Sequence, residues 1–142
     1  MIDERDERFL RRAIELAAAA PSLGDRPFGS LLVGPDDEIL VEAHNTAATE
    51  HDITAHPELK LARWAARELD PPRAAATTMY TSCQPCGMCA TAIERSGLGR
   101  VVFALSTEQF ERLAKPPSPA PVRYDGPALF EEARGPIDAF FR

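Results

Sequence analysis

Two short segments hold the residues of this chain whose types and spacing could do chemistry. The first is His56-Pro57-Glu58, and the second is Pro85-Cys86-Gly87-Met88-Cys89. One imidazole and two thiolates can bind zinc, and a zinc ion with three protein ligands keeps its fourth tetrahedral position open for water, as catalytic sites do. Glu58 then remains as a carboxylate that can move protons beside the metal.

The spacing of the two cysteines predicts that both lie on one helix. Cys86 and Cys89 are three apart, so their thiols would project from the same face. Pro85 fits the first turn of this helix, where its missing N–H costs nothing, and Pro57 is expected to begin a second helix in the same way. The positive partial charge at a helix N-terminus should help to keep both thiols ionised. We therefore expect two helix N-termini to meet at one metal.

A structural zinc site is the main alternative for these residues. It would need a fourth protein ligand, for which Cys83, His51 and His44 are candidates. Cys83, however, is expected to end a strand just before Pro85, where its thiol would be a small buried apolar group. His-x-Glu followed by Pro-Cys-x-x-Cys is much more specific than either part alone, and it is the signature of zinc-dependent nucleobase deaminases.

On these residues the chain resembles the cytidine deaminase-like superfamily, and within it the branch of guanine, cytosine and tRNA adenosine deaminases. The matching stretches cover about residues 5–110, and the run from Thr81 to Cys89 is most similar to guanine deaminases. In chain order the stretches are Arg26-Pro27-Phe28-Gly29-Ser30, Asn45, residues 51–58, residues 79–89 and Gly99-Arg100-Val101-Val102-Phe103.

This resemblance implies a fold and a set of roles. The fold would be α/β, a three-layer α/β/α sandwich around a five-stranded mixed sheet. The zinc ligands would be His56, Cys86 and Cys89, with Glu58 as the catalytic residue. Four residues would contact the substrate: Asn45 binding the base, Phe28 shaping the pocket, Pro57, and Gln84 through a backbone carbonyl near the leaving amine.

Two residues depart from the family pattern. The family usually has Ala or Gly at the position of Pro57, where the backbone N–H can donate to a ring carbonyl of the substrate. Proline has no N–H, and a carbonyl left unpaired in a dry pocket costs about 1–3 kcal/mol. Pro57 is therefore expected to disfavour bases that present a carbonyl there, as cytosine does. Gln84 replaces the usual Glu, which removes a charge near the metal.

Size and composition fit one small enzyme domain. The chain has 142 residues, 44% of them hydrophobic, so a single domain over residues 1–142 is expected. The net charge of −6 gives no general attraction to nucleic acid, which favours a free nucleobase or nucleoside over tRNA. Three cysteines, two of them candidate ligands, indicate a reducing compartment. No apolar run is long enough for a membrane and no signal peptide opens the chain, so a cytoplasmic location is expected.

Hydrophobic periodicity predicts alternating helices and strands. Trp64 is expected in the core, and residues 34–37 should form a hairpin turn, while residues 44–55 read as a loop. The metal residues would then lie at helix starts just beyond strand ends, the usual place for ligand sites in open α/β sheets. Helices are expected over residues 5–20, 56–69, 85–96 and 107–113, and strands over residues 28–33, 38–43, 76–82 and 100–105.

Residues 115–142 differ in kind from the rest. Residues 115–121 are proline-rich and should form a stiff extended connector, followed by short helices over residues 128–133 and 136–141. The phenylalanines of these helices must bury against something. They could pack on their own domain, cover the pocket as a lid, or contact a second subunit of a homodimer, which the resemblance to guanine deaminases favours. Three acidic residues could then accept hydrogen bonds from the base: Asp125, Glu131 and Glu132.

Together these features predict a zinc-dependent aminohydrolase. Water would attack an amine-bearing ring carbon while Glu58 takes a proton from the water, delivers it to a ring nitrogen and later protonates the leaving amine. Guanine or a related amino-purine is the leading substrate, which would place the reaction in purine metabolism. Cytosine, adenine, an amino-triazine and tRNA adenosine are alternatives, and so is a non-catalytic, zinc-stabilised interaction module.

Overall fold

The computed structural model describes residues 1–116 and 118–141, so Pro117 of the expected connector lies outside the described residues, as does Arg142. Helices and strands alternate along the chain much as predicted. The helices are α1 (Glu4–Ala19), a short 3-10 turn η1 (Pro21–Leu23), α2 (Ala47–Glu50), α3 (Pro57–Glu68), α4 (Pro71–Ala75), α5 (Gly87–Ser96), α6 (Thr107–Ala114) and α7 (Phe130–Phe141). The strands are β1 (Gly29–Val33), β2 (Ile39–His44), β3 (Thr78–Cys83) and β4 (Arg100–Leu105).

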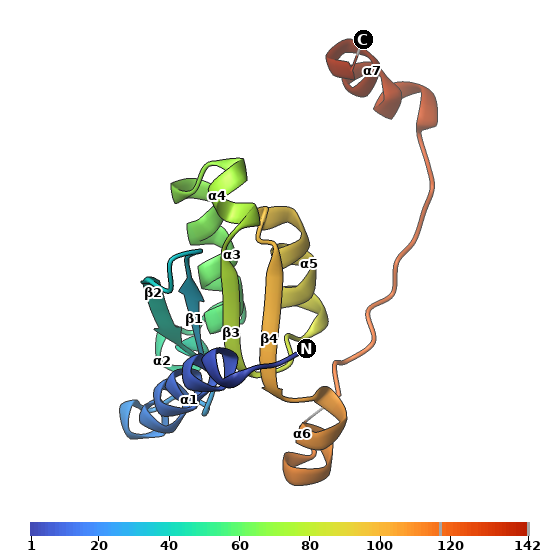
Figure 1. Ribbon diagram of the computed structural model, residues 1–142. Coiled ribbons are helices and arrows are strands. Elements are labelled where there is room, and N and C mark those ends of the chain that lie inside the picture. The colour runs from blue at the N-terminus through green and yellow to red at the C-terminus, as the bar shows by residue number, and fades with distance from the viewer. Residues whose placement is uncertain (117, 142) are drawn as a thin grey trace.

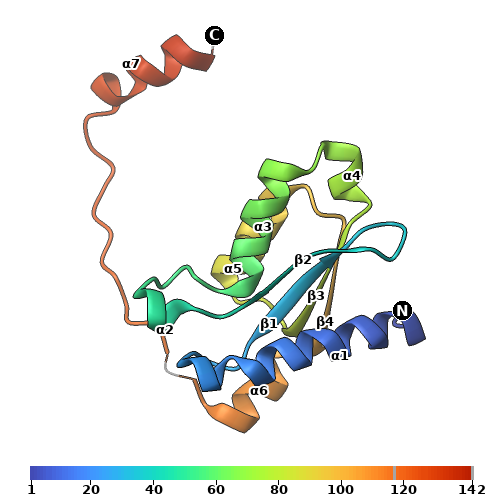
Figure 2. The same cartoon turned by 90° about the vertical axis from the view of Figure 1, so that its left-hand side faces the viewer.

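The strands form a mixed sheet in the order β2-β1-β3-β4 (Figures 1 and 2). β1 runs antiparallel to β2 and to β3, while β3 and β4 are parallel. The expected five-stranded sheet was therefore wrong by one strand among the described residues. The chain after α6 enters the proline-rich connector, where Pro116, Pro119 and Pro121 have no N–H to donate to a neighbouring strand.

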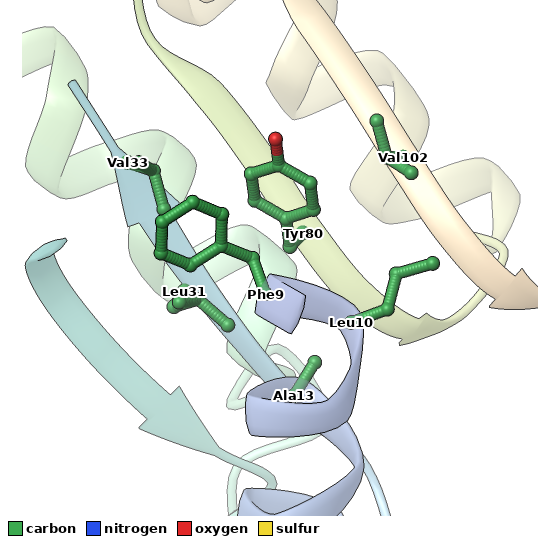
Figure 3. Packing of buried hydrophobic residues seen from close by; sticks show 7 residues of the cluster. All are labelled: Phe9, Leu10, Ala13, Leu31, Val33, Tyr80 and Val102. Carbon is green, nitrogen blue, oxygen red and sulfur yellow. The ribbon is translucent and has the colours of Figure 1, made fainter. Parts of the chain in front are cut away.

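Helices cover both faces of the sheet, which gives the expected three layers. On one face α1 packs Phe9, Leu10 and Ala13 against buried side chains that β1, β3 and β4 direct toward this helix (Figure 3). α1 approaches β1 closely at Gly29, where a Cβ atom would lie 2.5 Å from the backbone nitrogen of Ala17. The other face is covered by α3 and α5, and its core contains Leu32, Leu61, Ala62, Ala65, Met79 and Ile93.

A buried ionic cluster joins α1 to two strands. The Asp6 carboxylate is 1% exposed and accepts hydrogen bonds from Arg100 at 2.9 and 3.0 Å and from the Tyr80 hydroxyl at 2.7 Å. The Arg100 guanidinium holds the pKa of Asp6 far below its usual range. Burial, together with the hydrogen bond to Asp6, raises the pKa of Tyr80 to about 12. The cluster thus ties the first helix to β3 and β4.

The C-terminal tail lies apart from the sheet. α7 is one helix with Pro136 inside it, rather than the two short helices expected, and Figure 1 shows it well away from the other elements. Its aromatic side chains stay open, with Phe130, Phe140 and Phe141 68%, 78% and 76% exposed. Packing of the tail on its own domain is therefore not what the structure shows. No helix in the described part of the chain combines the length and apolar character needed to span a membrane.

Candidate active site

Two helix N-termini meet at one place, as the sequence predicts. His56 is the N-cap of α3, which begins at Pro57, and Cys86 is the N-cap of α5, with Cys89 in the first turn. The prediction was wrong in one detail, because α5 begins at Gly87 and Pro85 lies before the cap rather than in the first turn. α3 and α5 pack side by side beneath the site through the core on that face of the sheet.

The geometry of His56, Cys86 and Cys89 fits a zinc ion. The Nδ1 atom of His56 lies 3.5 Å from Sγ of Cys89 and 3.7 Å from Sγ of Cys86, and the three atoms lie within 4.8 Å of one another. Zinc–ligand bonds of about 2.0–2.3 Å at the tetrahedral angle would separate nitrogen and sulfur by about 3.6 Å. The side chains are therefore already spaced for a shared metal, and Nδ1 is the nitrogen that faces it.

No fourth protein ligand joins these three among the described residues. Cys83 is the last residue of β3 and is buried, as expected. His44 contacts the carbonyl of Asn45 through its Nδ1 atom at 2.9 Å, and His51 caps the end of α2. The arrangement is that of a site with an open coordination position, which catalytic zinc sites have and structural ones do not.

Burial works against thiolate formation in the absence of a metal. It raises the pKa of Cys89, and the nearby Glu58 and Cys86 raise it further. In the metal-free protein, desolvation of Cys89 thus opposes the ionisation that is expected at the helix N-terminus. A bound metal would displace the thiol proton. His56 has its pKa lowered by burial and by Arg26, which favours the neutral imidazole that binds metals.

Glu58 lies in the first turn of α3 and is 7% exposed. Its carboxyl group lies close to Ser30 and Cys89, and the Ser30 hydroxyl itself donates to the Thr81 hydroxyl at 2.7 Å. Burial raises the pKa of Glu58. A buried carboxyl group close to one of the three clustered side chains is well placed to exchange protons with water at the open position.

Asn45 and Phe28, two residues expected to contact the substrate, lie next to each other. Asn45 follows β2 directly and donates its backbone N–H to the carbonyl oxygen of Phe28 at 3.0 Å. Its side-chain oxygen accepts the N–H of Ala47 at 2.9 Å, so the Asn45 side chain caps the loop. The ring of Phe28 meets that of Phe110 edge to face, with 5.5 Å between the centroids.

Gln84 points toward α6 rather than toward the metal cluster. Its side-chain oxygen accepts the backbone N–H of Thr107 at 3.0 Å. The backbone N–H of Gln84 donates to the carbonyl oxygen of Leu105 at 2.7 Å. Gln84 thereby ties the start of α6, the helix that carries Phe110. The sequence reasoning missed both this tie and Phe110, because residues 84 and 107 come together only through the parallel pairing of β3 and β4.

Three other residues have structural roles. Asp52 accepts the N–H of Thr54 at 2.8 Å, which forms an Asx-type turn. Trp64 of α3, which is expected in the core, is half-buried and packs against the core from its margin. Lys60, which the sequence reasoning passed over, donates to two atoms of the loop that holds Asn45.

These features place the chain in a known class. Residues 3–105 match the family described as the cytidine and deoxycytidylate deaminase zinc-binding region. This chain belongs to that family, and it is a zinc-dependent deaminase.

Similar proteins include enzymes with different substrates. A probable cytosine deaminase of Schizosaccharomyces pombe is 33% identical over 126 residues, which cover 87% of this chain and 74% of that enzyme. A tRNA-specific adenosine deaminase of Haemophilus influenzae is 39% identical over 103 residues, covering 72% of this chain and 60% of that enzyme. The crystal structure of guanine deaminase from Bacillus subtilis superposes with a TM-score of 0.77 at 28% identity, covering 98% of this chain and 94% of that one.

Proposed function

We propose that this deaminase removes the amino group of a free nucleobase or nucleoside, with guanine or a related amino-purine as its substrate, and releases ammonia. The observation that carries the proposal is the cluster of His56, Cys86 and Cys89 with a buried Glu58 beside it. Three nitrogen and sulfur ligands with an open position, next to one proton carrier, are what hydrolytic deamination requires.

Two observations support a small purine over the alternatives. The superposition on the Bacillus subtilis guanine deaminase extends over 98% of this chain and therefore includes the tail. The net charge of −6 gives no general attraction to tRNA, although tRNA-specific relatives exist. Pro57 provides no N–H at the start of α3. It therefore disfavours cytosine, whose ring carbonyl would accept a hydrogen bond from this position.

Metal binding and proton transfer are carried out by different residues. His56, Cys86 and Cys89 hold the zinc, which when bound supplies the Lewis acid that makes water nucleophilic at neutral pH. Glu58 takes a proton from the attacking water, transfers it to a ring nitrogen of the base and then protonates the leaving amine. Water adds to the ring carbon and ammonia departs, so the product is the keto base.

Residues around the cluster position the base. Asn45 binds it through the side-chain amide, Phe28 forms a wall of the pocket, and the backbone carbonyl of Gln84 lies near the leaving amine. Pro57, the first residue of α3, is buried and limits which ring edge of the base can face that helix.

Ammonia release from the zinc-loaded protein tests this proposal. The compounds would be guanine, adenine, cytosine, amino-triazines, their nucleosides and a tRNA anticodon stem, with Glu58→Ala as the matched control. We expect guanine to be turned over, and we expect the variant to lose about 10²–10⁴-fold in rate while keeping its zinc. If no compound releases ammonia while zinc is bound and the fold is intact, the proposal is contradicted and a non-catalytic zinc-stabilised module is favoured.

The tail supports a second proposal, that the enzyme is a homodimer. The connector carries α7 away from its own sheet, and α7 leaves Phe130, Ile137, Phe140 and Phe141 exposed. Large apolar side chains gathered on one short helix usually mark a contact surface. A second copy of the chain is the occupant we propose, with the tail of one copy near the active site of the other.

A further inference from the structure

Lys60 lies one turn after His56 on α3 and reaches across to the loop that follows β2. Its Nζ atom donates to the carbonyl oxygen of His44 at 2.8 Å and to the hydroxyl of Thr46 at 2.9 Å. These two residues flank Asn45 on both sides. A half-buried lysine that holds the neighbours of a proposed base-binding residue is more than a solvated surface charge.

The same loop is also tied to the start of α3. The N–H of Thr46 donates to the carbonyl oxygen of Ala55 at 3.0 Å, and Ala55 immediately precedes His56. The backbone N–H of Asn45 donates to Phe28 on the opposite side. The position of Asn45 relative to the metal cluster therefore depends on contacts from α3, from the segment before it, and from the segment before β1.

The orientation of the Asn45 side chain determines what it can recognise. Its oxygen already accepts the N–H of Ala47, and an amide side chain has donors only on its nitrogen. The residue is 3% exposed, and no enclosed side-chain nitrogen or oxygen in the described part of the chain lacks a partner. The amide nitrogen makes no hydrogen bond to another described residue, so it keeps some access to solvent and offers donors alone.

We propose that Lys60 is a positioning residue that holds the Asn45 loop so that Asn45 presents only N–H donors to the substrate. The atom read by Asn45 is then an acceptor of the base, either a ring nitrogen or a carbonyl oxygen. This inference rests on the proposed function for the role of Asn45, but the contacts of Lys60 are independent of any substrate.

Lys60→Met tests the positioning role, because methionine has a similar length and no donor. Thr46→Val removes one of the two acceptors and leaves the lysine in place, and so serves if Lys60→Met fails to fold. Arg67→Met is the control, since Arg67 is an exposed cation later on the same helix. We expect KM for guanine, or for whichever compound is turned over, to rise about tenfold or more in Lys60→Met. We expect kcat and zinc content to stay near those of the parent.

Hydrogen exchange at the backbone N–H groups of Thr46 and Ala47 gives a readout that needs no substrate. Exchange should accelerate in Lys60→Met and Thr46→Val and remain unchanged in Arg67→Met. Unchanged exchange together with an unchanged KM in Lys60→Met would overturn the inference, as would a loss confined to kcat. If the parent turns over none of the compounds, the proposed function fails while the exchange rates still decide whether Lys60 holds the loop.

Asn45→Asp tests the donor assignment. Aspartate keeps an oxygen for the N–H of Ala47, but its second oxygen is an acceptor where the amide nitrogen is a donor. We expect the melting temperature to stay close to that of the parent while substrate affinity falls at least tenfold, by about as much as in Asn45→Leu. Undiminished affinity in Asn45→Asp would show that Asn45 does not read an acceptor of the base.

Discussion

The first residue of α3 has no N–H to offer a substrate, because it is Pro57. A base that relies on this position for a hydrogen bond would leave its own acceptor unpaired, at a cost of about 1–3 kcal/mol in a dry pocket. Recognition of such an acceptor would then have to come from groups elsewhere in the site.

Replacing Pro57 by alanine restores one N–H at the edge of the site. We expect kcat/KM for cytosine to rise by about tenfold in Pro57→Ala, because one hydrogen bond to a ring carbonyl becomes available. Steady-state ammonia release measures it. Pro71→Ala is the matched control, since Pro71 begins α4 in the same way but lies outside the site. No gain over the parent would show that Pro57 does not set this preference.

The residue types alone were enough to predict the metal cluster, whereas the contacts around it were not predictable. Imidazole, thiol and carboxyl groups carry their chemistry in their identity, so His56, Glu58 and the two cysteines could be assigned from spacing. Lys60 has an ordinary identity, and its role depends on the loop after β2 returning to α3. The commitment of the Asn45 oxygen to Ala47 likewise becomes visible only once the loop is folded.

At the scale of elements, α6 is attached to the domain near its first turn. A Ser106 capping box starts it, Gln84 accepts the N–H of Thr107, and Phe110 meets Phe28. No residue of α6 is fully buried. If Phe28 forms a wall of the pocket, as we propose, that wall depends on a helix that is held by few contacts.

Removing the Gln84 tie should loosen α6 and the aromatic pair. In Gln84→Leu we expect faster amide exchange over residues 107–114 and a severalfold rise in KM with little change in melting temperature, because the lost bond caps an exposed helix end. Gln84→Glu keeps the acceptor and adds a favourable charge at a helix N-terminus, so it should behave like the parent. Exchange and KM values that are equal in all three proteins would contradict this role.

The Asp6 cluster makes the attachment of α1 dependent on pH. The folded pKa of Asp6 lies below its unfolded value of about 3.9, so the stabilisation is complete above that value and is lost as pH falls toward the folded pKa. Asp6→Asn should lower the free energy of unfolding at pH 7 by about 1.5–3 kcal/mol. It should also weaken the loss of stability below pH 4. Urea unfolding across pH measures both effects, with Asp36→Asn in the exposed β1–β2 turn as the control. Parallel profiles of unfolding free energy against pH for the parent and Asp6→Asn would refute this role of Asp6.

Element types were predictable from periodicity, and the exceptions have physical reasons. β4 was placed at residues 100–105 as observed, because apolar β-branched residues lie between clear breaks. Residues 47–50 and 71–75 form single helical turns that are too short to show a period. The fifth strand was inferred from resemblance alone, and the prolines after α6 do not support it.

At the scale of the whole molecule, the tail is the main surface without a partner. If the enzyme is a homodimer through α7, then Phe140→Ser combined with Phe141→Ser should shift it toward monomers, because two of its exposed aromatic rings are lost from the contact. Light scattering after size exclusion measures the mass, and Glu132→Gln on the same helix is the control. A parent that is monomeric at high concentration would contradict the homodimer.

The pairing of α3 with α5 has a consequence for how this protein can be studied. The metal ligands come from the ends of two helices, and the small buried side chains Ala62 and Ala65 of α3 belong to the same core cluster as Ile93 of α5. A larger residue at Ala65 would spread the ligands without altering any of them, and the cluster would bind zinc more weakly. Zinc affinity is therefore a sensitive gauge of interior packing, and it can reveal strain in the core far from the metal before unfolding does.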